Sequence, residues 1–164
     1  MNGCKNNIIP AKIESSYFRG DLKAYTEALY KIFKRDFIDN DLIFEGKKVD
    51  IIHEKYYDGK ERSFWHIISE GEQDSDRTPV SRRAETLPWT RALIEDKQEC
   101  CDYKKWIKFH DKTNKNRYYI WCSAINYMVI LEDRGPIFKL ITAFKVQEYN
   151  VKKYNREYEK YKSE

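Results

Sequence analysis

The segment RYYIWCSAINYMVILEDRGPIFKLITAFKV, residues 117–146, decides the fold because it contains three runs of β-forming residues joined by short connections. Strands are expected at 117–122, 126–133 and 137–146, and YKKWIKFH at 103–110 supplies a fourth. Such short links require antiparallel neighbours. Both faces of 117–122 and 126–131 are apolar or aromatic, so these two strands are expected in the centre of the sheet.

The segment before this sheet begins with a clear helical pattern. Apolar residues in DLKAYTEALYKIFKRDF recur at helical spacing, which predicts a helix over 21–37 with Asp21 as its N-cap. Glu45-Gly46 predicts a turn between extended runs at 42–45 and 48–56. Asp58-Gly59 predicts a second turn.

The middle of the chain leaves two alternatives open. Residues 62–69 fit a strand or a short helix, because FWHII leaves little polar face. Residues 70–80 are polar and predict a loop. Ser81 is a candidate cap for a helix to about residue 96, but Pro88 interrupts it. Either that helix is kinked, or Thr86 caps a second one that holds the proline in its first turn.

Together these elements predict one α+β domain, as expected for 164 residues. An N-terminal helix, a small hairpin and a helical middle would pack on a C-terminal antiparallel meander of about four strands. We expect a flexible N-terminus over 1–18, the domain over 19–148, and a basic, tyrosine-rich tail or helix over 149–164.

The charge balance is mildly basic, with 31 Lys and Arg against 27 Asp and Glu. A net charge of +4 permits an anionic partner without demanding one. No run of 18 apolar residues indicates a membrane span. The N-terminal residues contain no apolar signal-peptide core, so we expect a cytoplasmic protein or one delivered without a cleaved signal.

Cysteine and glycine patterns point to no cofactor. The four cysteines (Cys4, Cys100, Cys101 and Cys122) have no zinc-ligand spacing, and we expect reduced thiols. His53 and His110 add no metal-ligand pattern. The glycine-rich loops of nucleotide-binding proteins are absent from the sequence, so neither a metal nor an organic cofactor is expected.

Three pieces of the sequence together resemble a known group of nucleases. They are FWHIISEG at 64–71, DRTPVSRRAETLPW at 76–89 and NYMVILEDRGPIFKLITAFKV at 126–146. Their order and spacing resemble the barnase–EndoU–colicin–RelE (BECR) nuclease fold, in particular its phage-associated branch. The resemblance covers residues 42–146.

This resemblance implies a metal-independent endoribonuclease that acts as a toxin or conflict effector of a phage or mobile element. In such enzymes the ribose 2′-hydroxyl attacks the neighbouring phosphorus and the 5′-oxygen leaves. The reaction needs a proton acceptor, a proton donor and cations around the phosphorane. The implied partners are RNA and a cognate inhibitor protein, with no membrane.

The resemblance also suggests roles for individual residues. His66 would transfer protons, since its ordinary pKa suits neutral pH; the alternative is a core histidine. Arg83 would hold phosphate charge. Thr142 would orient the phosphate, and simple strand alternation puts it on one face with Phe138, Leu140 and Phe144. The expected substrate-binding residues are Arg77, Arg82, Arg91, Arg134, Trp89 and Tyr119.

The sequence does not identify the second proton-transfer group, for which Glu85, Tyr119 and His110 are all candidates. This gap keeps two other functions open. One is a non-catalytic RNA- or protein-binding module on the same fold. The other is an adaptor whose aromatic surface binds a partner.

Overall fold

The four predicted C-terminal strands belong to a six-stranded sheet in the computed structural model, which describes residues 10–70, 79, 81–95 and 102–164. The sheet order is β1-β2-β8-β7-β6-β5. Its strands are β1 (Ile43–Phe44), β2 (Lys47–Asp50), β5 (Tyr103–His110), β6 (Lys115–Cys122), β7 (Tyr127–Asp133) and β8 (Ile137–Lys145). Strands β5 to β8 are antiparallel neighbours, whereas β2 runs parallel to β8. The predicted α+β class and meander are confirmed.

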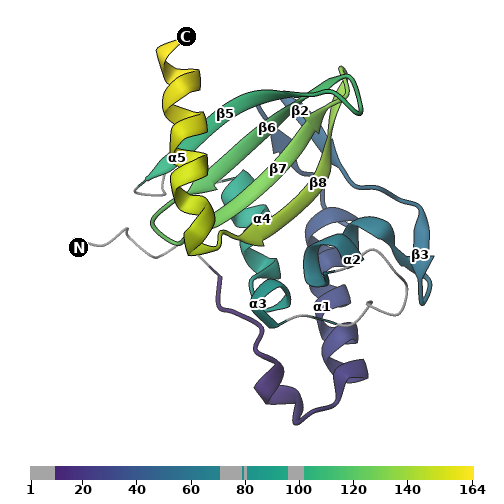
Figure 1. Cartoon of the computed structure of the whole chain (residues 1–164). Coiled ribbons are helices and arrows are strands. Elements are labelled where there is room, and N and C mark those ends of the chain that lie inside the picture. Colours follow the sequence, from purple (N-terminus) through teal and green to yellow (C-terminus); the bar gives the residue numbers. More distant parts are fainter. Residues whose placement is uncertain (1–9, 71–78, 80, 96–101) are drawn as a thin grey trace.

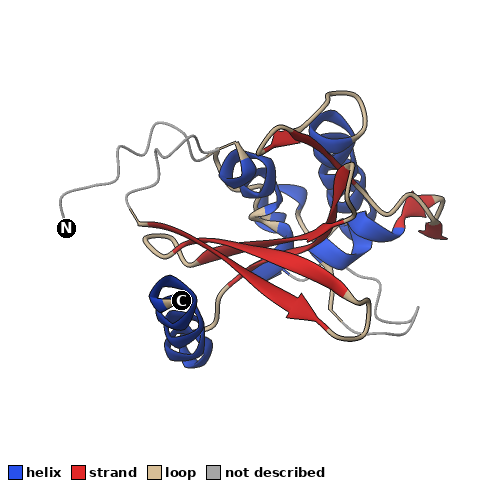
Figure 2. Ribbon diagram, turned by 90° about the horizontal axis from the view of Figure 1, so that it is seen from above, coloured by secondary structure: helices blue, strands red, loops and turns tan. Residues whose placement is uncertain are grey.

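Helices cover both faces of the sheet. Figure 2 shows α5 alone on one side, while the other α-helices lie on the opposite side. The helices are α1 (Leu22–Phe37), α2 (Arg62–Ile68), α3 (Ser81–Ala84), α4 (Leu87–Ile94) and α5 (Glu148–Ser163). A 3₁₀ turn, η1 (Ser15–Phe18), precedes α1, and a small ribbon of β3 (Lys55–Tyr57) and β4 (Lys60–Glu61) precedes α2.

The sheet separates two hydrophobic clusters. The larger includes Phe33 of α1, Phe64 of α2 and Leu131 of β7. The smaller includes Trp106 and Trp121, with tyrosines of α5 packed against it. Residues 127–132 of β7 are all buried, which confirms that this strand is central.

Local signals explain the elements that the sequence predicted well. The carboxylate of Asp21 accepts a hydrogen bond from the backbone N–H of Ala24 at 3.0 Å, so it caps α1 as expected. Glu45 and Gly46 both have positive φ, at 48° and 79°. Two such residues form the turn type that joins a tight antiparallel hairpin, here β1 to β2.

The structure resolves the open alternatives. Residues 62–68 form a helix, and the segment after Ser81 forms two short helices with Thr86 at the N-cap of the second. The expected extended run at 48–56 is wrong as one strand, because β2 ends at Asp50 and β3 begins at Lys55. The expected loop at 70–80 lies mostly outside the described residues. The tail is helical over Glu148–Ser163.

Two further expectations concern the termini and the thiols. The backbone N–H of Ile13 donates to the carbonyl of Glu85 at 2.9 Å, so residues 10–18 contact the domain. Cys122 is disulfide-bonded, and the expectation of reduced thiols is therefore wrong for this residue. No helix among the described residues is long and apolar enough to cross a membrane.

Candidate functional site

Arg83 is the centre of the candidate site, and its guanidinium joins three elements. The Nη2 atom donates to the carbonyl of His66 at 2.6 Å, the hydroxyl of Thr142 at 3.0 Å and the carbonyl of Ala143 at 3.3 Å. The Nε atom donates to the carbonyl of Ile67 at 3.2 Å. One side chain of α3 therefore connects the end of α2 to β8.

The end of α2 provides a physical reason for part of this arrangement. His66 and Ile67 lie in the last turn of a helix that ends at Ile68. Carbonyls in the last turn lack intrahelical partners and carry partial negative charge. Arg83 satisfies two of them, and a cation at this position is favourable. The backbone of α2 thus fixes the guanidinium.

The second half of β8 provides the other anchor. Strand β2 pairs with β8 only at Ile137–Lys139, so Ala143 lies beyond the paired stretch. Ile130 faces Thr142 and Leu131 faces Leu140, which leaves Ile141 as the extra residue of a β-bulge. A bulge redirects side chains and is common beside functional sites.

The bulge overturns the predicted alternation around Thr142. Phe138 and Leu140 belong to the larger cluster, whereas Phe144 packs with the smaller cluster on the α5 side. Thr142 pairs with Ile130, which is also in the smaller cluster. Thr142 therefore does not share one face with Phe138 and Leu140, because the extra residue shifts the alternation by one position.

The charge of Arg83 has no neutralising partner nearby. All its hydrogen-bond acceptors are uncharged, and among the described residues no carboxylate forms an ion pair with it. Burial lowers the pKa of this guanidinium, while the more distant Glu70 carboxylate acts in the opposite direction. The group nevertheless stays protonated, as arginine does in proteins. The site is a fixed cation suited to an anion.

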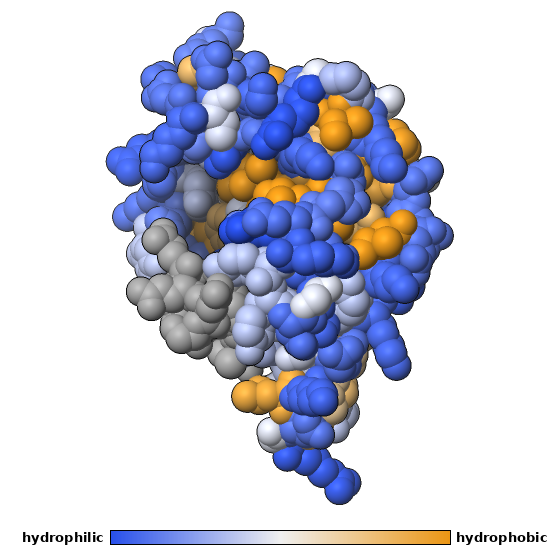
Figure 3. Space-filling model, turned by 90° about the vertical axis from the view of Figure 1, so that its right-hand side faces the viewer, coloured by the Kyte–Doolittle hydropathy of each residue, from blue (hydrophilic) through white to orange (hydrophobic). Residues whose placement is uncertain are grey.

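No described residue bonds one edge of this guanidinium. Nη1 donates to no atom of the described residues, and it is not among their fully buried side-chain atoms that lack a partner. An anion could therefore reach Nη1 without displacing the bonds that hold the side chain. On the flank where β8 lies in Figure 1, the surface is hollowed, with hydrophobic residues between hydrophilic rims (Figure 3).

Arg82 is next to Arg83 in the chain, but its charge is paired with Glu70. It is exposed, and its Nε donates to a carboxylate oxygen of Glu70 at 2.9 Å. That hydrogen bond and the charge of Glu70 raise the pKa of Arg82, and the Tyr149 phenol adds a smaller effect. Tyr149 is the second residue of α5.

Two predicted substrate-binding residues have evident packing roles instead. Arg91 donates to the carbonyls of Asp36, Asn40 and Asp41 and to the carboxylate of Glu95, so it fastens α4 to the end of α1. Arg83 and the residues that bond it, His66, Ile67, Thr142 and Ala143, form what we call the Arg83 cluster. The hydrogen bonds of Arg91 to described residues do not reach this cluster.

Trp89 is nearly buried. Its Nε1 donates to the carbonyl of Pro10 at 2.9 Å, and its ring meets Tyr127 edge to face. It holds the N-terminal segment against α4. For Trp89, as for Arg91, binding of a substrate remains a prediction.

Arg134 lies away from the cluster. It precedes β8 and bonds the buried Glu132 at 2.7 Å, while Thr142 lies five residues beyond Ile137. That separation corresponds to about 15 Å along a strand. Arg77 lies outside the described residues.

Tyr119 lies nearer to Thr142 in the sheet than Arg134 does. The register aligns Tyr119, Ile130 and Thr142 across three neighbouring strands. At about 4.8 Å per strand, the backbones of Tyr119 and Thr142 are about 10 Å apart. The Tyr119 ring stacks on Trp106, with the centroids 5.2 Å apart. A nucleotide bound at Thr142 could reach this aromatic row.

The candidates for a second proton-transfer group have other partners. Glu85 pairs with Lys12 at 3.4 Å. His110 lies 3.3 Å from the Thr113 hydroxyl, which itself donates to Glu132 at the other end of the sheet. Burial raises the pKa of Tyr119. Among the described residues, none of the three is hydrogen-bonded to the side chain of Arg83 or Thr142.

Sequence reasoning missed two contributors. Glu70, which follows α2, bonds Arg82, and Tyr149, at the start of α5, contributes to the raised pKa of that arginine. Glu70 belongs to the quoted segment FWHIISEG, so a weak signal was present. Tyr149 carried no comparable signal, because only the path of β8 brings α5 to this point.

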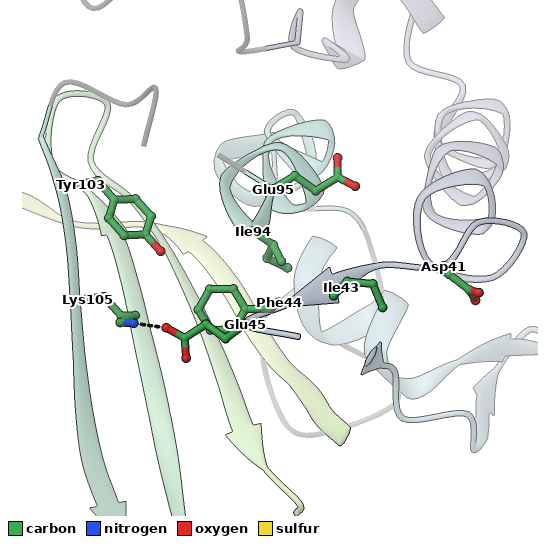
Figure 4. A pocket seen from close by; sticks show the side chains of 8 residues that line it. All are labelled: Asp41, Ile43, Phe44, Glu45, Ile94, Glu95, Tyr103 and Lys105. Carbon is green, nitrogen blue, oxygen red and sulfur yellow. Dashed lines mark hydrogen bonds and ion pairs between the residues drawn. The ribbon is translucent and has the colours of Figure 1, made fainter. Parts of the chain in front are cut away.

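A separate cavity of about 460 Å³ is a poor phosphate site. Figure 4 shows carboxylates from three positions around it, together with one lysine. Its lining residues are Asp41, Ile43, Phe44, Glu45, Ile94, Glu95, Tyr103 and Lys105. The Lys105 ammonium is already paired with Glu45. Asp41 and Glu95 are paired in the same way with Lys48 and Arg91, so these cations are not free to bind an anionic ligand.

No protein-family model, curated protein or solved structure matches the chain. Within the described ranges, no group of three or more His, Cys, Asp or Glu side chains is placed to hold a metal ion.

Proposed function

We propose that this chain is a metal-independent endoribonuclease of the BECR kind, which cleaves RNA by attack of the 2′-hydroxyl. The observation that carries the proposal is Arg83. A cation held by neutral oxygens, with one edge that no described residue bonds, is pre-organised for a phosphate. Its hydroxyl neighbour, Thr142, and its helical neighbour, His66, are the residues that the resemblance pairs with it.

The proposed chemistry assigns each group one task. His66 accepts the proton of the 2′-hydroxyl as its oxygen bonds to phosphorus. Arg83 stabilises the charge that develops on the phosphorane oxygens, and Thr142 orients one of them. The bond to the 5′-oxygen then breaks, leaving a 2′,3′-cyclic phosphate. The proton for the 5′-oxygen comes from a second group or from water.

The proposed setting follows from the substrate and the resemblance. RNA is the partner, the cytoplasm is the place of action, and the protein acts as a phage or mobile-element toxin with a cognate inhibitor. The disulfide at Cys122 is typical of proteins that pass through an oxidising compartment. A toxin that is delivered from an oxidising compartment into the cytoplasm of a target cell would have both the disulfide and the cytoplasmic place of action.

The decisive experiment incubates purified protein with total RNA in excess EDTA. We expect discrete fragments with 2′,3′-cyclic phosphate ends. His66→Ala should lower the rate by about 10²–10⁴-fold, because proton transfer contributes on this scale. His53→Ala is the matched control, since His53 is exposed and pairs with Asp50 at 2.6 Å.

Two results would contradict the proposal. Equal cleavage by wild type and His66→Ala would remove the assigned proton-transfer residue. Loss of all cleavage in EDTA, restored by a divalent cation, would show a metal-dependent reaction instead.

The second candidate function is a non-catalytic RNA- or protein-binding module. The observation that favours it is the position of Glu85, His110 and Tyr119, none of which, among the described residues, is hydrogen-bonded to the side chain of Arg83 or Thr142. A folded wild type that binds many RNAs but cleaves none would support this function. Steep weakening of the binding by salt would indicate phosphate contacts rather than a protein partner.

A further inference from the structure

Helix α5 packs on the sheet through one narrow face. Tyr154 and Tyr158 lie 6.1 Å and 6.2 Å from the Trp106 ring centroid. Glu157, at the side of this face, accepts hydrogen bonds from Trp106 at 3.3 Å and from Lys108 at 3.0 Å. These contacts fix the rotation of the helix, and therefore determine which residues point away from the sheet.

The outward face is basic and contains no carboxylate. At 3.6 residues per turn, its five residues lie on an arc of about 100°, opposite Tyr154 and Tyr158. They are Tyr149, Lys152, Lys153, Arg156 and Lys160, and all are exposed. None of the four cations forms an ion pair with a carboxylate of the described residues. We call these five residues the outer stripe.

Unpaired cations also occur on α1, where Lys23, Lys31 and Lys34 form no ion pair among the described residues, but the carboxylate of Glu27 lies between them on that helix face. Lysines of β5 show a different arrangement, because Lys105 pairs with Glu45 and Lys108 with Glu157. The chain also has nearly balanced charges, 31 positive and 27 negative. A helix face with four unpaired cations therefore has the character of a surface for a polyanion.

The outer stripe begins beside the candidate site. Only five residues separate Thr142 from the start of α5 at Glu148, and the charge of Tyr149 has a small effect on the pKa of Arg82. From there α5 runs away from the end of β8 (Figure 1). Lys152 and Lys160 are about 12 Å apart along the helix axis. A strand that leaves Arg83 would meet Tyr149 first and the cations next.

We propose that the outer stripe binds the RNA strand that continues from the scissile phosphate, with Tyr149 stacking an unpaired base and the cations contacting successive phosphates. The inference rests on the proposed function and adds a substrate class, single-stranded RNA longer than a dinucleotide. Stacking on an aromatic ring requires an unpaired base. Phosphate contacts position the strand without reading its sequence.

The test compares two triple variants with the same loss of charge. One is Lys152→Gln, Arg156→Gln and Lys160→Gln on α5. The control is Lys23→Gln, Lys31→Gln and Lys34→Gln on α1, where the three lysines are also exposed on a 16-residue helix. Binding is measured with a 20-nucleotide single strand, 2′-O-methylated so that it cannot be cleaved, over a range of salt concentrations.

The α5 variant should lower the slope of log affinity against log salt by about 2, because each phosphate contact contributes about 0.7 for a single strand. The α1 variant should leave it unchanged. Tyr149→Ala should weaken binding by at least about fivefold, and Tyr149→Phe should restore it. Equal slopes in the two triple variants would overturn the proposal, as would equal effects of the α5 variant on a blunt RNA duplex.

Cleavage separates this inference from the proposed function. For each protein, kcat/KM for the unmodified 20-mer is divided by kcat/KM for a dinucleotide. This ratio should be about tenfold higher for wild type than for the α5 variant. Cleavage with an unchanged slope and ratio would overturn the outer stripe alone. A changed slope without any cleavage would overturn the nuclease and leave the stripe as an RNA-binding surface.

Discussion

Two charged side chains with little exposure, Glu132 of β7 and Arg83 of α3, are held in opposite ways. Toward one end of β7 and β8, Glu132 is fully buried and accepts hydrogen bonds from Thr113, Arg117 and Arg134 at 2.7–2.9 Å. Toward the other, the described residues that bond Arg83 supply a hydroxyl and backbone carbonyls. The first charge is neutralised within the protein, whereas no carboxylate of the described residues pairs with the second.

The difference separates a structural cluster from a candidate binding site. A buried charge with opposite charges around it completes its interactions when the chain folds. A cation held by dipoles keeps its charge available, so an anion that replaces water there gains a strong interaction. Changes at Glu132 should therefore affect stability, and changes at Arg83 should affect the reaction.

The largest expected effect is that of Arg83→Gln on RNA cleavage. We expect kcat/KM to fall by about 10²–10³-fold, the usual result of removing one group that stabilises transition-state charge. The measurement is a cleavage rate per folded molecule, with folding checked by circular dichroism. A fall that only matches the loss of folded protein would make Arg83 a structural residue like Glu132.

Glu132→Gln should produce the largest change in stability. The neutral amide leaves two arginines without a counter-ion, although both still reach water. We expect the free energy of unfolding at pH 7 to fall by about 2 kcal/mol. Urea unfolding measures this value. RNA cleavage by the folded variant should match that of wild type, and a large loss of activity would contradict the division between the clusters.

The pH dependence of stability sharpens the same comparison. Burial alone would raise the pKa of Glu132, but hydrogen bonds from Arg117, Thr113 and Arg134 outweigh it and lower the pKa below its ordinary value. The stabilisation is therefore present above the unfolded-state pKa of about 4.3 and is lost as the pH falls through the folded-state pKa. The stability gap between wild type and Glu132→Gln should be constant from pH 5 to 7 and shrink below pH 4. A gap that widens in acid would reverse this assignment.

Thr142→Val should have the smallest effect of the four. It removes one hydroxyl that accepts from Arg83 at 3.0 Å and keeps a β-branched shape in the strand. A lost hydrogen bond to a charged group corresponds to about tenfold in kcat/KM. Thr142→Ser should recover most of the rate. Equal rates for the valine and serine variants would show that the hydroxyl has no part in the reaction.

The sequence alone determined the elements whose signals are local. Strand alternation and short connections predicted the four-stranded meander, and the Asp21 cap with helical spacing predicted α1. The resemblance singled out Arg83 and Thr142, which the structure brings within 3.0 Å. The strand and helix predictions succeeded because their deciding residues are neighbours in the chain or repeat at a fixed period, whereas the roles of Arg83 and Thr142 stay a prediction.

Only the tertiary structure decided how those elements meet. The bulge at Ile141 reversed the predicted face of Thr142, because one extra residue shifts every later side chain. The end of α2 and the unpaired part of β8 placed neutral oxygens around Arg83, while the turn after β7 placed Arg134 on Glu132. The sequence around an arginine does not predict whether its hydrogen-bond partner is a carboxylate or a carbonyl. Long-range packing sets that partner, and with it the charge that remains available for a ligand.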